Sequence, residues 1–137
     1  AAGESGNKEF LKKLIYAQVR NVLLNKSFHE VMDVDTGRAW RWPHLPWHAA
    51  GFIGFIVNGV FGIRYSEQGI QVHPCILDEF EGAVLDSVPY QNAKFVFEIH
   101  GHGDSYTVKL DGNPLEGFFG KEMTGEHKVD IYAHETE

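Results

Sequence analysis

The 137-residue chain contains a single cysteine, Cys75, and this scarcity excludes two kinds of stabilisation. One thiol cannot form a disulfide within the chain, and it cannot supply the several thiolates of a cysteine-built metal site. The expected role of such a residue is that of a small, buried apolar side chain. We therefore expect the fold to depend on packing rather than on cross-links.

Several signatures of function are also missing. The chain has no long basic run and carries a net charge of −7, which argues against a nucleic-acid partner. The first ten residues lack the basic-then-apolar layout of a signal peptide. There is no glycine-rich phosphate loop before a helical pattern and no serine or cysteine nucleophile motif. His100 and His102 lie two residues apart, but no carboxylate or cysteine pattern accompanies them, so we expect no metal and no cofactor.

The most apolar stretch, residues 47–61, contains only two strongly polar side chains, His48 and Asn58. A helix that crosses a bilayer needs about 20 apolar residues. This stretch is shorter and is interrupted by glycines, so we expect no membrane partner. Pro46 predicts that a helix begins there, since proline is tolerated in the first turn. A helix that is apolar on all faces must be covered on all sides, which predicts a buried core helix.

A first helix is predicted over residues 8–24. Asn7 can cap it, and its apolar residues recur at steps of three and four. A connection of about 20 residues then leads to the apolar helix, and loops of that length are usually functional or disordered. Its phenylalanine and tryptophans are a poor composition for disorder. We therefore predict a helical hairpin with a functional loop.

After residue 63 the apolar pattern changes to alternation. Strands are predicted at 69–73, 94–100, 105–110 and 127–134, with weaker patterns at 83–89 and 115–119. Turn signals such as Asp111-Gly112-Asn113-Pro114 separate them. The predicted fold class is α+β, with a helical hairpin at 1–64 followed by a small antiparallel β-sandwich at 65–137. A chain with only two helices cannot surround an all-apolar one on every side. We therefore expect the chain to be the C-terminal piece of a larger protein.

Four motifs carry a resemblance to a known family. They are F-H-E-V-M-D-x-D-T-G (28–37), P-W-H-A-A-G-F (46–52), G-V-F-G-I (59–63) and G-I-Q-V-H-P (69–74). In this order they resemble the end of the six-hairpin glycosidases, the (α/α)6-barrel glycoside hydrolases and phosphorylases. That group includes trehalase-, glucosidase-, maltose-phosphorylase- and rhamnosidase-like families. The segment K-L-D-G-N-P-L-E-G (109–117) is similar to a hairpin of their C-terminal sandwich.

The resemblance implies that the chain is the last hairpin and sandwich of an inverting enzyme that hydrolyses glycosidic bonds. Glu30 falls where such enzymes place a general base. It also lies between apolar residues at the mouth of the predicted hairpin. Trp40 and Trp42 could stack on a sugar, and His29, next to Glu30, is a further candidate for substrate binding. Asp33 and Asp35 are expected to form the turn.

The implied partners are a carbohydrate and the remaining barrel helices of the parent chain. Alone, the chain is expected to be inactive, because it supplies only one candidate catalytic carboxylate. Its apolar helix would then be partly exposed, which predicts self-association or docking of the helices onto the sandwich. The alternative function is a non-catalytic β-sandwich module that braces a barrel or binds a glycan.

Overall fold

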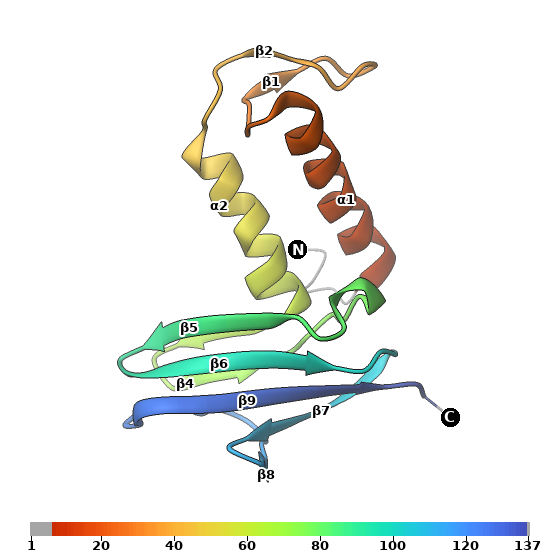
Figure 1. The fold of residues 1–137 in the computed structure, drawn as a ribbon. Helices are drawn as coiled ribbons and strands as arrows, with labels where there is room; N and C mark the ends of the chain where they lie inside the picture. Colours follow the sequence, from red (N-terminus) through yellow and green to blue (C-terminus); the bar gives the residue numbers. More distant parts are fainter. Residues whose placement is uncertain (1–6, 137) are drawn as a thin grey trace.

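The computed structural model describes residues 7–136. Helix α1 spans Lys8–Asn25 and helix α2 spans Pro46–Gly54, and α2 continues directly into a π-helical segment, η1, over Phe55–Val60. A short 3-10 helix, η2, covers Asp78–Phe80. In Figure 1 both long helices stand on the same side of the large sheet, and strands β1 and β2 lie at their far ends.

The two helices begin where local signals place them. The Asn7 side chain accepts a hydrogen bond from the Phe10 amide at 2.9 Å, so it caps α1 as expected. Lys26 directly follows the last helical residue, and its left-handed conformation, with φ 61°, ends α1. Pro46 occupies the first turn of α2. The predicted cap at Asn7 and the predicted helix start at Pro46 are confirmed.

Within residues 7–136, nine strands form three separate sheets. Two are hairpins: β1 with β2, and β3 with β4. The third has five strands in the order β5-β6-β9-β7-β8, and within it β6 and β9 run parallel. The strand bounds are Val31–Met32 (β1), Ala39–Arg41 (β2), Ile63–Ser66 (β3), Gly69–Val72 (β4), Val84–Tyr90 (β5), Asn92–His100 (β6), Ser105–Leu110 (β7), Asn113–Pro114 (β8) and Thr124–His134 (β9).

The predicted fold class, a helical hairpin followed by a small antiparallel β-sandwich, is wrong. Strands account for more of the chain than helices, and they form one mixed five-stranded sheet rather than two facing antiparallel sheets. β9 lies between β6 and β7, although β6 and β7 are consecutive in the chain. Alternation determines which residues share a face, but not which strands are neighbours. Residues 115–119 form no regular strand, and only Phe119 bridges to Ile70.

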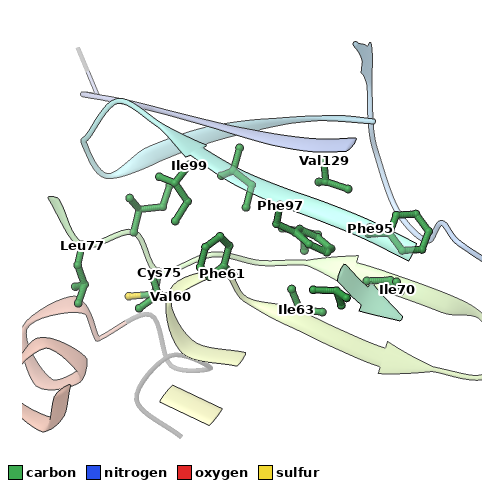
Figure 2. Packing of buried hydrophobic residues seen from close by; sticks show 14 of the residues in the cluster. Val60, Phe61, Ile63, Ile70, Cys75, Leu77, Phe95, Phe97, Ile99 and Val129 are labelled. Carbon is green, nitrogen blue, oxygen red and sulfur yellow. The ribbon is translucent and has the colours of Figure 1, made fainter. Parts of the chain in front are cut away.

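The core lies between the large sheet and the β3–β4 hairpin (Figure 2). Alternate residues of β6 and β9 point into it and are completely buried, namely Phe95, Phe97, Ile99, Val129 and Ile131. From the other side it is closed by η1, β3, β4 and the segment before η2, through Val60, Phe61, Ile63, Ile70 and Leu77. Each such side chain contributes about 1.5–3 kcal/mol through burial. This core connects the helices to the sheet.

The turn from η1 into β3 depends on Gly62. Its φ is +66°, and a Cβ at this position would overlap the carbonyl of His73. The close approach lets the His73 amide donate to the Gly62 carbonyl at 2.9 Å. Glycine adopts this conformation without steric cost, so the approach of the two segments requires it.

The prediction of a buried core helix is not met by α2. None of its residues is buried, and Trp47 and Ile53 are 60% and 58% exposed. Only Leu11 and Ile15 of α1 are buried, because just the sheet-proximal parts of the helical layer reach the core. Lys8, paired with Asp78 and Asp104 at 3.2 Å, anchors α1 to the β region. Within residues 7–136, no helix combines the length and apolarity needed to cross a bilayer.

Candidate functional site

The loop between the helices folds into the β1–β2 hairpin. Val31 pairs with Arg41, and the Glu30 amide donates to the Trp42 carbonyl at 3.3 Å. Glu30 and Trp42 therefore lie opposite each other across the open end of this hairpin. The loop predicted to be functional is thus an ordered structure, not an irregular chain.

Asp33 closes the other end of the hairpin. Its Oδ1 accepts hydrogen bonds from the Thr36 hydroxyl and amide, both at 2.7 Å, and from the Asp35 amide at 3.1 Å. These bonds, that of the Thr36 hydroxyl first, lower the pKa of the Asp33 carboxyl. The prediction that Asp33 forms the turn is confirmed.

Asn25, at the end of α1, ties the hairpin to the helix. Its Nδ2 donates to the Gly37 carbonyl at 2.9 Å, and its Oδ1 accepts from the Ala39 amide at 2.8 Å. Both partners are backbone groups of the hairpin. The side-chain amide of Asn25 therefore satisfies these two groups and also fixes the position of the hairpin against α1. No motif in the sequence indicated this role for Asn25.

Trp40 and Trp42 are exposed, at 66% and 55%, and Arg41 lies between them. The Arg41 guanidinium carbon is 5.0 Å from the Trp40 ring centre and 5.2 Å from that of Trp42. Both distances fall within the range of cation–π attraction, which favours this arrangement of the two indoles. Arg41 was not among the predicted site residues; its position between two tryptophans was the available signal.

The segment after Trp42 carries backbone strain. Trp42 and His44 have φ values of 41° and 63°, which non-glycine residues rarely adopt. Ser27 holds the segment in place, since its hydroxyl accepts from the His44 amide at 3.1 Å and lies 2.9 Å from His44 Nδ1. The hairpin exit is therefore held by specific contacts in a conformation that costs free energy.

The two other predicted site residues lie in different surroundings. Glu30 is exposed, and among residues 7–136 no group hydrogen-bonds its carboxylate. His29 instead lines a cavity of about 10 Å³ next to α1, and its buried Nδ1 has no hydrogen-bond partner among the described residues. Such a volume holds about one water molecule. The structure thus places the His29 ring against the first helix, whereas the tryptophans face solvent.

A second cluster lies on the open face of the large sheet. His100 Nε2 is 2.7 Å from Asp130 Oδ1 and 3.9 Å from Glu98 Oε2. Lys128 Nζ lies 2.7 Å from Glu98 and 3.0 Å from Asp130. Three of these side chains, Glu98, His100 and Asp130, place their ligand atoms within 4.8 Å of one another and could hold a metal ion. The sequence prediction considered His100 with His102, but the structure pairs His102 with Glu81 at 3.4 Å.

Charge neighbours outweigh burial in this cluster. Burial by itself would raise the pKa of the Asp130 carboxyl, yet the hydrogen bonds from His100 and Lys128 lower it. The carboxylates of Glu98 and Asp130 in turn raise the pKa of the Lys128 ammonium, and the hydrogen bond to Glu98 contributes most. Asp130 therefore stays ionised in its buried position.

An open groove of about 370 Å³ lies between β4 and the β7–β8 hairpin. His73, Tyr106 and Glu116 are among the residues that line it. This volume is within the range of small-molecule sites, and its lining combines an aromatic ring with hydrogen-bonding side chains. It is a third surface on which a ligand could bind.

The chain matches no protein-family model, and no curated protein is significantly similar to it. The resemblance to six-hairpin glycosidases stays a prediction. Any assignment of function therefore depends on the residues of these three surfaces.

Proposed function

We propose that the chain is part of an enzyme that hydrolyses glycosidic bonds, and that the β1–β2 hairpin forms one wall of its sugar pocket. Glu30 is the general base, and Trp40 and Trp42 are the surfaces on which a sugar ring stacks. The supporting observation is the exposed tryptophan pair around Arg41, with a carboxylate opposite Trp42 that makes no hydrogen bond among residues 7–136. Aromatic surfaces with a few polar groups are typical of ligand sites.

The chemistry requires a second carboxyl group. An inverting glycosidase uses a base that activates water and an acid that protonates the leaving oxygen, about 6.5–9.5 Å apart. On this hairpin Asp33 is engaged by the bonds of the turn, and Asp35 lies in the turn itself, at the end away from Trp42. Glu30, opposite Trp42, is therefore the candidate base. The acid must come from helices of the same enzyme outside this chain. The isolated chain is accordingly expected to show no turnover.

The exposed apolar surface of the helices supports this part of the proposal. α2 has no buried residue, and α1 exposes Phe10 and Leu23, at 50% and 65%. Exposed apolar surface of this extent usually marks an interaction site. In the proposed enzyme, further helices of the same enzyme cover these faces. His29 lines the small cavity beside α1 rather than the tryptophan surface, so in this proposal it does not contact the sugar.

The test is Glu30→Gln in the enzyme formed when this chain is joined to its remaining helices. Loss of a positioned general base lowers kcat by a factor of roughly 10²–10⁴. KM changes little, because the interaction strengthens in the transition state. The matched control is Asp35→Asn, an exposed carboxylate in the same hairpin, which leaves kcat nearly unchanged. A Glu30→Gln enzyme that retains most of its kcat would falsify the role of Glu30.

The groove beside β7 favours a second candidate, a module that binds a glycan without catalysis. Tyr106 is 38% exposed there and offers an aromatic face. The two functions are distinguished by measuring how strongly the chain and its variants are retained on a panel of immobilised oligosaccharides. Loss of retention in Tyr106→Ala, but not in Trp40→Ala, supports the binding module. The reverse pattern supports the hairpin as the sugar site.

A further inference from the structure

We propose that Glu98, His100 and Asp130 form a binding site for a divalent transition-metal ion, with Zn²⁺ as the ion that fits best. This site lies on the β region and is independent of the proposed glycosidase function. The three side chains offer one nitrogen and two carboxylate groups as ligands, all within 4.8 Å of one another.

The ligands come from the two central strands. Glu98 and His100 are two residues apart on β6, so their side chains project from the same face. Asp130 is the partner of Glu98 on β9. The alternate residues of β6, Phe97 before Glu98 and Ile99 after it, are completely buried on the opposite face and hold the backbone in position. A site built on adjacent packed strands keeps its geometry better than a site on loops.

The distances are close to those of a metal site. Ligand bonds of about 2.0–2.1 Å in tetrahedral geometry place ligand atoms about 3.3–3.4 Å apart. His100 Nε2 and Asp130 Oδ1, at 2.7 Å, would separate slightly, and His100 Nε2 and Glu98 Oε2, at 3.9 Å, would approach slightly. Small side-chain rotations accomplish both changes. Water would complete the fourth position.

The histidine is already oriented. Its ring stacks on Tyr132 with centres 4.7 Å apart and planes at 19°. Lys109 Nζ lies 5.1 Å from the Tyr132 ring centre and favours that position of the tyrosine. Packing contacts of this kind restrict the orientation of the imidazole ring. The imidazole nitrogen also decides the type of ion, because Ca²⁺ and Mg²⁺ prefer oxygen ligands whereas Zn²⁺ accepts nitrogen.

Lys128 holds the position of the cation when no metal is bound. Its ammonium contacts both carboxylates, but its side chain is 50% exposed and can swing into solvent. One lysine against two carboxylates leaves one net negative charge when His100 is neutral. A divalent ion that displaces the ammonium removes this imbalance. The lysine therefore competes with the metal and weakens its binding.

Calorimetric titration of the full 137-residue chain with Zn²⁺ tests the site, with visible absorption of bound Co²⁺ as a second readout. The expected result is one ion per chain, with nitrogen and oxygen ligands in tetrahedral geometry. His100→Ala lowers the affinity about 10- to 100-fold or abolishes binding. His102→Ala, the exposed histidine two residues away, is the matched control and leaves the affinity unchanged. Circular dichroism verifies that each variant is folded.

The Lys128→Met variant distinguishes a metal site from a purely structural charge cluster. If the ammonium competes with the metal, its removal raises the Zn²⁺ affinity above that of the wild type. A purely structural charge cluster would show no Zn²⁺ binding in either protein, and that outcome overturns the proposal. Binding that persists in His100→Ala and disappears in His102→Ala would overturn it as well.

Discussion

The large sheet and the helical layer differ in how completely the chain covers their apolar residues. On the sheet, Phe97, Ile99 and Ile131 are completely buried. In the helical layer, α2 is no less apolar, yet none of its residues is buried. The sheet thus completes its core within this chain, whereas α2 does not. An apolar stretch requires cover, but its sequence does not identify what provides it.

The largest expected difference between the two regions is in stability. Phe97→Ala removes a fully buried ring and should lower the free energy of unfolding by about 3–5 kcal/mol. Ile53→Ala on α2, where the side chain is 58% exposed, should change it by less than about 0.5 kcal/mol. Urea unfolding of both variants measures the contrast. Similar losses in the two variants would mean that α2 is covered within the chain after all.

The next effect concerns association. The exposed helical faces should cause the chain to self-associate at high concentration, as detected by sedimentation velocity. Ile53→Glu should weaken association about tenfold or more, since burying a side chain of this size contributes about 1.5–3 kcal/mol. The control is Val84→Glu on the sheet edge, where Val84 is 54% exposed. A chain that stays monomeric throughout, or a stronger effect from Val84→Glu, would contradict the role of α2.

The smallest effect is a pH dependence of the sheet. Asp111 Oδ2 lies 2.7 Å from His127 Nδ1, and this hydrogen bond raises the pKa of His127. The stabilisation by protonated His127 is complete below its ordinary pKa of about 6.5 and is lost as pH rises through the raised value. The melting temperature should therefore fall by a few degrees between weakly acidic and weakly alkaline pH.

His127→Asn should remove most of this slope, whereas His134→Asn, an exposed histidine on the same strand, should keep it. At acidic pH the dependence of stability on pH has the opposite sign, because Asp111 rather than His127 titrates there. Hydrogen bonds from the Lys128 amide and then from His127 lower the pKa of Asp111. Stability from Asp111 is thus lost as pH falls through that lowered value. A wild-type slope that persists in His127→Asn would show that other groups cause it.

Part of the candidate site could be predicted from sequence. The order of the glycosidase-like motifs indicated Glu30, Trp40 and Trp42, and their catalytic and sugar-binding roles stay predictions. The turn at Asp33 followed from local hydrogen-bonding rules and is confirmed. The order Trp40-Arg41-Trp42 was the available signal for Arg41, but the approach of its guanidinium to both indoles depends on side-chain packing.

The sequence alone determined the features that depend on near neighbours in the chain. These are the cap at Asn7, the helix start at Pro46, and the alternation that buries Phe95, Phe97 and Ile99 of β6. Such features follow from periods of two or 3.6 residues and from capping groups within one turn.

Only the tertiary structure decided the strand order, with β9 inserted parallel to β6, and the exposure of α2. It also brought Asp130 to Glu98 and His100 across 30 residues of chain. Alternation makes Glu98 and His100 share a face, but it cannot identify the strand beside them. That choice depends on how the connections and the core pack together, and it places Asp130 at this cluster.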